Sequence, residues 1–407
     1  MSATAFEEGN PLDRAVYFGL ILLLGLVLMG RHLDWGSVSA RNATLILIIV
    51  LALVSTLWSD FPFITAKRWL RDLGNYLCVL VVLSDDYPTE AVKSVIRNLS
   101  FILVTLSVLL NKYFLDISRK YDQYTGSFEY DGVATGKNLL AMICMISALF
   151  FLWDITDRWS KRKRPRARNV ILLDLFFLGL SLQVQYVAHS TTAHVCFALG
   201  SLVMLMFQVR KVREYTKAYK VLIPALFILY LVLDFGLGMN GSMAQAVGKD
   251  PSLTDRTHIW AFLLGMHTNP LIGTGYQSFW LGPRLMDFWN NAGLGRINEA
   301  HNGYLETYLE EGLIGLSVLV LFLAATYKTI CRRVDRRMEL GLFGLATWLV
   351  FVFYNMSEAA NEGGYLFLVF LMASVQMPAS RARKDATRPT RANVGSRLEP
   401  KLAGHLR

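Results

Sequence analysis

Long apolar runs alternate with short polar segments along most of the chain. Eleven of these runs have the length and composition of membrane-spanning helices, and their soft boundaries lead us to expect 11 or 12 spans. They cover residues 15–30, 42–58, 70–84, 95–111, 138–154, 170–187, 192–208, 221–238, 313–327, 340–356 and 364–377. Because lipid offers no partners to backbone polar groups, the pattern predicts an all-α integral membrane protein.

One polar region, residues 239–308, is too long for a simple connector and predicts short helices of its own. Ser252 and Asp255 form a helix-capping signature, and Arg256 heads an apolar face at helical spacing. A second helix is predicted to begin near His301 and to run into the following span. We expect one membrane domain over residues 1–377 and a basic, disordered tail over 378–407.

Basic residues predict the orientation of the chain. The net charge is +10, and four clusters at 158–168, 210–220, 328–337 and the tail from 381 hold 25 of the 41 Lys and Arg residues. Since basic loops remain in the cytoplasm, the segments 112–136, 188–191, 239–308 and 357–363 are predicted to lie outside. Juxtamembrane placement indicates contact with the lipid bilayer rather than with nucleic acid.

The cysteines and the first apolar run add little chemistry. Cys78, Cys144 and Cys196 fall inside apolar runs and Cys331 lies at a cytoplasmic edge, so no disulfide framework is expected. No Cys or His spacing indicates a metal site, and no cofactor is predicted. The first run lacks a basic leader and a cleavage site, which favours an anchor.

Two residues in the polar region are candidates for catalysis. Arg256 could bind a phosphate or diphosphate, although for a single arginine a salt bridge to Asp250, Asp255 or Glu299 is the more common explanation. His301 could take a proton from a hydroxyl near neutral pH, although a lone histidine is more often a cap or a core residue.

Further residues are candidates for substrate binding. Tyr276 and Trp280 could stack on sugar rings, or belong to an interfacial aromatic belt. Arg68 and Arg71 fall on the side predicted to be outside, against the usual charge bias, which indicates a bound anion or an error in the topology.

Four more candidates lie beside helix ends. Lys137 and Asn138 stand at a Gly-rich helix entry that lacks the spacing of a nucleotide-binding loop. His189 belongs to a polar string that fits a site or a hydrogen-bonded turn, and Asn302 and Glu306 flank His301, where Glu299 or Glu306 could orient or replace it.

Five strings in order resemble the O-antigen ligase and exopolysaccharide polymerase superfamily. They are the WSD-x-P string at 58–62, the G-x-x-x-G-K-N-x-x-A string at 132–141, the T-x-R-T-x-I-W string at 254–260, NPLIGTGYQSFW at 269–280, and the A-H-N-x-Y-L…E-G-L-x-G string at 300–315. Each alone is weak, but together they span residues from about 45 to 330. The Lys-Asn string and the PLIGTGYQSFW string are closer to the polymerase branch.

The resemblance implies a metal-independent glycosyltransferase related to the GT-C class, with an undecaprenyl-diphosphate-linked donor at the periplasmic face of the bacterial inner membrane. By motif, Arg256 would bind the diphosphate and His301 would activate or orient the acceptor hydroxyl. Lipid tails would lie in a groove between apolar helices. Two departures are Asp255 where the family often has Gly, and His189 where it has Arg or Lys; Lys137, Arg68 or Arg71 would then supply a second phosphate contact.

The sequence therefore predicts polymerisation of lipid-linked oligosaccharide repeats for an exported polysaccharide, with a flippase and a chain-length regulator as possible partners. Transfer of a finished polymer to lipid A-core by a ligase is the alternative, because no motif defines the acceptor. A transporter would show mid-membrane charges and internal symmetry, which are not evident. A non-catalytic assembly scaffold remains open.

Overall fold

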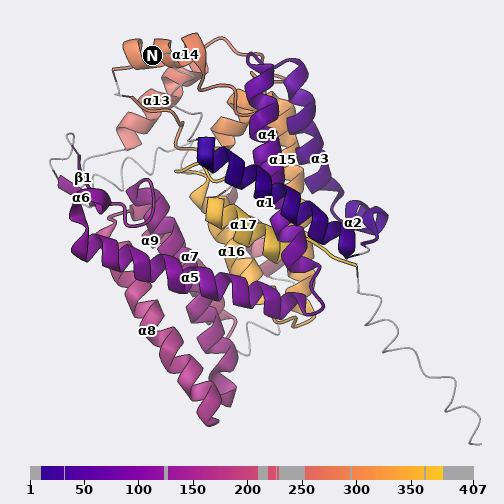
Figure 1. Cartoon of the computed structure of the whole chain (residues 1–407), viewed down its shortest axis with the longest axis vertical. Coiled ribbons are helices and arrows are strands. Elements are labelled where there is room, and N and C mark those ends of the chain that lie inside the picture. Colours follow the sequence, from indigo (N-terminus) through magenta and orange to yellow (C-terminus); the bar gives the residue numbers. More distant parts are fainter. Residues whose placement is uncertain are drawn as a thin grey trace, which may run out of the picture.

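The computed structural model describes residues 11–31, 33–122, 127–209, 219–225, 227–228, 253–293, 296–361 and 364–378. Helices form nearly all of the regular structure in these ranges (Figure 1). The elements before the 210–218 gap are α1 Pro11–Gly30, α2 Trp35–Arg41, α3 Ala43–Val54, η1 Ser55–Leu57, α4 Pro62–Leu83, α5 Pro88–Tyr113, α6 Leu115–Ser118, β1 Arg119–Asp122, β2 Ser127–Tyr130, α7 Lys137–Arg158, η2 Trp159–Lys161, α8 Pro165–Val187 and α9 Thr191–Met206. Those after it are α13 Leu253–Gly265, α14 Gly282–Asn291, α15 Gly303–Asp335, α16 Gly341–Tyr354 and α17 Gly364–Ser374.

The predicted all-α membrane fold is confirmed. Ten of the eleven predicted segments coincide with helices, and the segment 221–238 lies mostly outside the described residues. Within the described part of the chain, five helices are long and apolar enough to cross a membrane, or six if the bent pair α2 and α3 counts as one span. α9, α16 and α17 are shorter apolar helices. The count of 11 or 12 spans therefore stays a prediction, as do the domain boundaries, and the tail beyond 378 lies outside the described residues.

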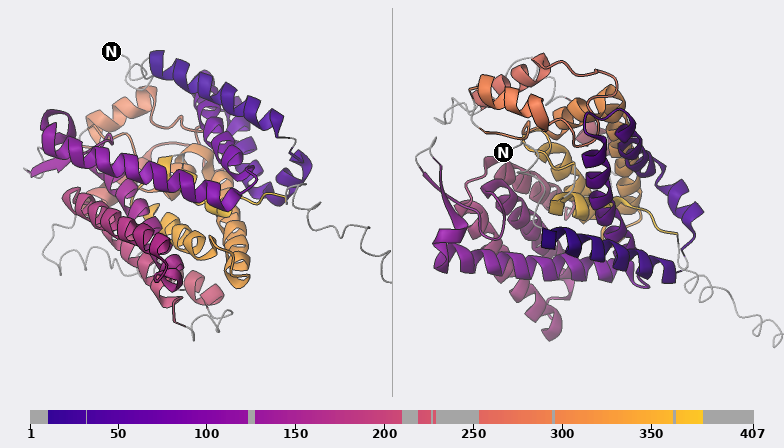
Figure 2. Two further views of the ribbon diagram at one scale, coloured as in Figure 1. Left: turned by 60° about the horizontal axis from the view of Figure 1, so that its bottom comes forward. Right: turned by 45° about the horizontal axis from the view of Figure 1, so that its top comes forward.

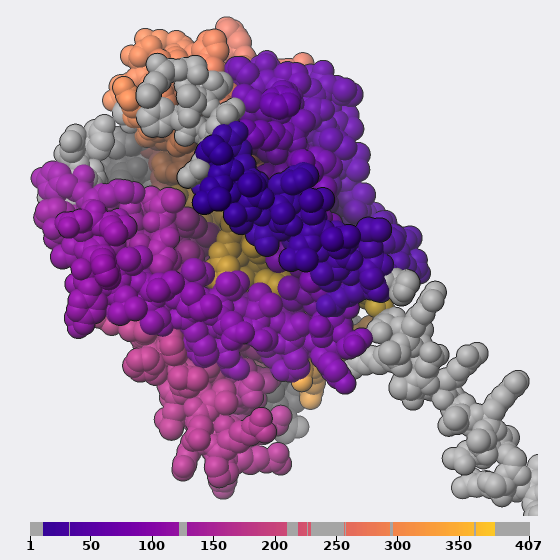
Figure 3. Space-filling model, viewed as in Figure 1, coloured from indigo at the N-terminus to yellow at the C-terminus, as the bar shows by residue number. Residues whose placement is uncertain are grey.

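The buried centre of the bundle consists of α7, α16 and α17. Most side chains of these helices are buried in one core cluster, which α5, α8 and α9 cover from one side and α3, α4 and α15 from the other (Figures 1 and 2). By contrast, only 6% of the residues in the 18-residue apolar stretch of α1 are buried. Figure 3 shows α1 across the surface, with the C-terminal helices visible in a hollow between α1 and α5. The exposed leucines of α1 are compatible with contact to lipid.

A break in α15 fastens the loop at 269–280 to the bundle. Gly312 has a φ of 66°, and a Cβ there would lie 2.2 Å from the backbone carbon of Leu271. The interrupted helix leaves backbone groups free for the loop: Leu313 N–H donates to the carbonyl of Pro270 at 2.9 Å, and Gly275 N–H donates to that of Glu310 at 2.7 Å. Backbone groups of the NPLIGTG string thus form hydrogen bonds with backbone groups of α15 that an uninterrupted helix would bond internally.

A small antiparallel hairpin, not predicted from the sequence, precedes α7. β1 and β2 pair with Arg119 opposite Tyr130. An ion pair between Lys137 and Glu129 connects the hairpin to the first residue of α7. The hairpin, α13, α14 and the start of α15 share one end of the bundle, which we call the loop end (Figure 1).

Candidate active site

The turn between α16 and α17 is built around Asn355. Its side-chain amide donates to the carbonyl of Phe351, and its Oδ1 accepts from the N–H of Ala360. The N–H of Gly303, at the start of α15, donates to the carbonyls of Asn355 at 2.8 Å and Glu358 at 3.1 Å. A Cβ at Gly303 would lie 2.2 Å from Asn355 Oδ1, so this close approach requires glycine. The contact brings the residues before α15 next to Glu358.

Glu358 joins three of the candidate residues. Its Oε1 accepts hydrogen bonds from Asn138 Nδ2 at 2.9 Å and from Arg256 at 3.0 Å, and its Oε2 lies 3.3 Å from His301 Nδ1. Only 6% of the Glu358 side chain is exposed. A buried carboxylate requires such partners, and charge-assisted hydrogen bonds of this kind are the strongest available. We call Asn138, Arg256, Glu299, His301 and Glu358 the Glu358 cluster.

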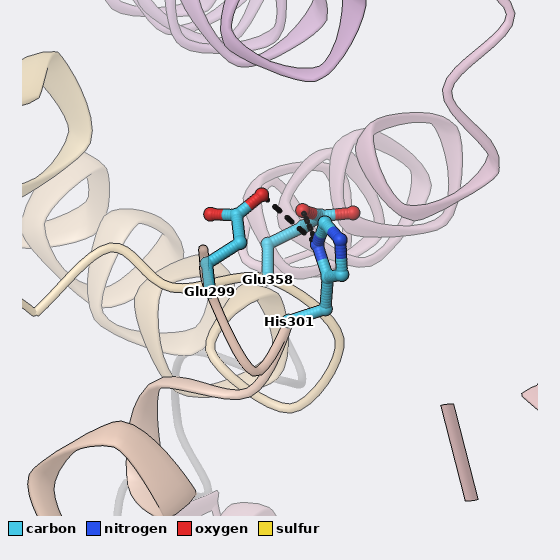
Figure 4. A group of neighbouring side chains, drawn as sticks. All are labelled: Glu299, His301 and Glu358. Carbon is cyan, nitrogen blue, oxygen red and sulfur yellow. Dashed lines mark hydrogen bonds and ion pairs between the residues drawn. The ribbon is translucent and has the colours of Figure 1, made fainter. Parts of the chain in front are cut away.

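His301 has an uncommon backbone conformation and two carboxylate neighbours. Its φ is 50°, in the left-handed region that non-glycine residues rarely occupy. Nδ1 faces Glu299 Oε1 at 3.1 Å as well as Glu358 (Figure 4). Burial lowers the pKa of His301, but the hydrogen bond to Glu358 and the charges of Glu299 and Glu358 outweigh this, so the pKa is raised. In the neutral ring with its proton on Nδ1, beside the carboxylates, Nε2 is the acceptor.

A second polar cluster surrounds Asp72 on α4. Asp72 accepts from Arg71 Nε at 3.1 Å, from the hydroxyl of Tyr276 at 3.0 Å and from Gln277 Nε2 at 2.8 Å. Arg68 donates to the carbonyl of Gln277. We call these five residues the Asp72 cluster. It brings together Arg68, Arg71 and Tyr276, but these hydrogen bonds join α4 to the 269–280 loop and not to Arg256.

Two comparisons with known proteins found similar sequences. Residues 176–320 match the family described as O-antigen ligase. The chain is also 26% identical over 388 residues to the exopolysaccharide production protein ExoQ of Rhizobium meliloti (strain 1021). The matched region covers 91% of this chain and 84% of that protein. Together the two matches support the O-antigen ligase and exopolysaccharide polymerase superfamily for this chain. With the long apolar helices, they indicate a multi-pass membrane protein and a glycosyltransferase-like enzyme.

The part of the chain that matches the O-antigen ligase family contains Arg256 and His301 but not Glu358. Sequence reasoning missed Glu358 because it lies in a short turn, 57 residues from His301 and 102 from Arg256. The available signal was a carboxylate in one of the turns predicted to lie outside. The role of Trp260 was also missed: its indole N–H donates to the carbonyl of Ala300 at 2.8 Å and so connects α13 to the residue before His301.

The remaining residues predicted to bind substrate have mainly structural contacts. Trp280 is 6% exposed and donates from its indole N–H to Glu306 Oε2 at 2.8 Å, while Glu306 also accepts from the N–H of Ala300. Asn302 caps α15 by accepting from two backbone N–H groups. His189 is exposed at the α8–α9 turn and lies near the ring of Tyr186. Binding of substrate by these residues remains a prediction.

The Glu358 cluster also has the ligand types of a metal site. Glu299, His301 and Glu358 each offer one ligand atom, and these atoms lie within 4.8 Å of one another. Carboxylate oxygens and an imidazole nitrogen suit several divalent ions. However, Arg256 already bonds one oxygen of Glu358, so a cation bound by all three residues would lie beside a guanidinium.

Proposed function

We propose that this protein polymerises undecaprenyl-diphosphate-linked oligosaccharide repeats at the periplasmic face of the inner membrane. The observation that carries this proposal is the junction at Glu358 between a guanidinium, Arg256, and an imidazole, His301. Transfer of a sugar from a diphosphate needs a base for the acceptor hydroxyl and a cation for the departing phosphate, and the cluster supplies both types of group.

In the proposed reaction the acceptor oxygen forms a bond to the anomeric carbon of the donor sugar while the bond to the diphosphate oxygen breaks. The acceptor proton passes to Nε2 of His301. Arg256 stabilises the negative charge that remains on the lipid diphosphate. Glu358 is a positioning residue, because it directs the Nδ1 proton and fixes the ring. No nucleotide sugar takes part.

Metal independence is part of the proposal. Arg256 lies 3.0 Å from Glu358 and already supplies a positive charge at the place where a divalent ion would bind. The hollow between α1 and α5 lies beside a helix that is apolar and mostly exposed, which supports a groove for the polyprenyl chain there (Figure 3).

The test uses the full-length protein in lipid nanodiscs with a synthetic undecaprenyl-diphosphate oligosaccharide, with and without lipid A-core. We expect longer lipid-linked chains without added acceptor, resolved by gel and mass spectrometry. His301→Ala and Arg256→Ala should each lose at least about 100-fold in rate, the usual contribution of a general base or a charge-stabilising group. His258→Ala is the matched control, because His258 is exposed on the same helix as Arg256.

Other outcomes would redirect the assignment. Transfer only to added lipid A-core would make the protein a ligase. Unchanged turnover in both variants would remove Arg256 and His301 from the site. No sugar transfer from any lipid-linked donor would favour a transporter or a scaffold.

A further inference from the structure

A second hollow at the loop end lies between α13 and α14. It has a volume of about 440 Å³, within the range of small-ligand sites. Phe262, Met266 and His267 line it from the end of α13, and Arg284 and Asp287 line it from α14. The Glu358 cluster contributes none of its lining residues.

One aromatic ring is available in this hollow. Phe279 and Phe288 are each 1% exposed and Trp280 is 6% exposed, so the last two aromatic residues of the 269–280 loop and Phe288 of α14 form core. Phe262 is only half-buried, and its ring is held edge-on against Phe288 at 5.5 Å. A ring fixed from behind and open in front can pack against the apolar face of a sugar at little cost in side-chain entropy.

The polar groups of the hollow favour a neutral ligand. His267 and Asp287 are exposed, and Arg284 is bonded to Asp60 at 2.7 Å while stacked over Phe279 at 5.1 Å. Arg284 is thus paired with Asp60, and Asp287 adds a second carboxylate to the lining, so neutral sugar rings fit the hollow better than a phosphate or an acidic sugar. An imidazole, a carboxylate and a guanidinium together donate to and accept from hydroxyl groups.

Helix α13 sets the separation between the hollow and the Glu358 cluster. Arg256 stands in its first turn and Gly265, which lines the hollow, is its last residue. Nine residues at the rise of an α-helix span about 14 Å, a length that a few linked sugar rings cover. A glycan whose end reacts at His301 can thus reach the hollow with rings further along the chain.

We propose that the α13–α14 hollow is a glycan subsite that binds neutral sugar rings several units from the bond being formed. This inference rests on the proposed function for the position of the reacting end. It predicts that longer lipid-linked oligosaccharides bind better than short ones, because only the longer chains fill the hollow.

The test compares wild type with Asp287→Ala, Phe262→Leu and the control Asn290→Ala, which is exposed on α14 outside the hollow. With long lipid-linked substrates we expect Asp287→Ala and Phe262→Leu to raise KM about three- to tenfold, as for the loss of one good contact, with kcat unchanged. With the shortest substrate that still reacts, all four proteins should have the same KM. A fall in kcat at every length, or an unchanged KM at every length, would overturn the subsite.

Direct binding separates this inference from the proposed reaction. A neutral oligosaccharide repeat without lipid or diphosphate is titrated against full-length protein in nanodiscs by saturation-transfer NMR. Binding that weakens in Asp287→Ala and Phe262→Leu but not in Asn290→Ala would support the subsite even if no transfer occurs. Equal binding in all four proteins, or no binding, would reject it while leaving any observed transfer intact.

Discussion

The Glu358 cluster and the Asp72 cluster are both centred on a buried carboxylate at the loop end, yet their partners differ. Asp72 is bonded to groups of α4 and of the 269–280 loop, so its contacts fasten two segments together. Glu358 instead bonds a guanidinium from α13, an amide from α7 and a titratable ring before α15. Two carboxylates can therefore be equally buried and still differ in their partners: Asp72 connects two segments of the chain, whereas Glu358 contacts an arginine and a histidine from different elements.

Replacing each carboxylate by its amide gives the largest expected contrast. Glu358→Gln removes the charge that directs the His301 proton, and we expect kcat to fall about 100-fold, at the lower end for general-base catalysis. Asp72→Asn should instead lower the free energy of unfolding by about 1–3 kcal/mol, because a buried acceptor becomes partly a donor. Transfer rates and thermal unfolding in nanodiscs measure both. Similar losses of kcat in the two variants would contradict the distinction.

The two arginines provide a smaller contrast. Arg256→Lys keeps the charge but loses the planar fork, and we expect kcat/KM to fall about 10-fold or more, since arginine and lysine are not interchangeable at such contacts. Arg71→Lys should have a smaller effect, because Arg71 bonds Asp72 and Gln277. Equal losses, measured with the same lipid-linked donor, would mean that the Asp72 cluster also binds the diphosphate.

The dependence of the rate on pH should separate two effects on His301: the orientation of its ring by Glu358 and the negative charge of Glu299. His301 must be neutral to accept a proton, so the rate should rise with pH through its pKa, which is raised above the ordinary value. Glu299→Gln removes a negative charge that raises this pKa, and the acidic limb should move to lower pH. Glu358 would still orient the ring. Rate–pH profiles of wild type and Glu299→Gln measure the shift, and a limb that moves upward would contradict the assigned cause.

Much of the fold and part of the site could be predicted because their signals are local. Apolar runs determine helices by length and composition alone, and ten of the eleven segments were found in this way. Arg256 and His301 were singled out because they stand in the long polar region 239–308 and have side chains that can bind a phosphate or take a proton. Glu358 was not, because its significance depends on a turn that packs against Gly303. Trp280 was a candidate for sugar stacking or for an interfacial belt by residue type, but its hydrogen bond to Glu306 is visible only after folding.

The smallest expected effect is that of metal removal. It decides whether Glu358 binds a metal ion or orients His301. Glu299, His301 and Glu358 could bind an ion, whereas Asp72 is bonded to donor groups. We expect an unchanged rate after treatment with a chelator, because Arg256 already supplies the positive charge beside Glu358. Loss of activity that returns with added divalent metal would make Glu358 and His301 ligands, and His301 could then no longer act through a free ring as the base. Unchanged activity would leave orientation of His301 as the role of Glu358, because the buried carboxylate would then have no ion to hold.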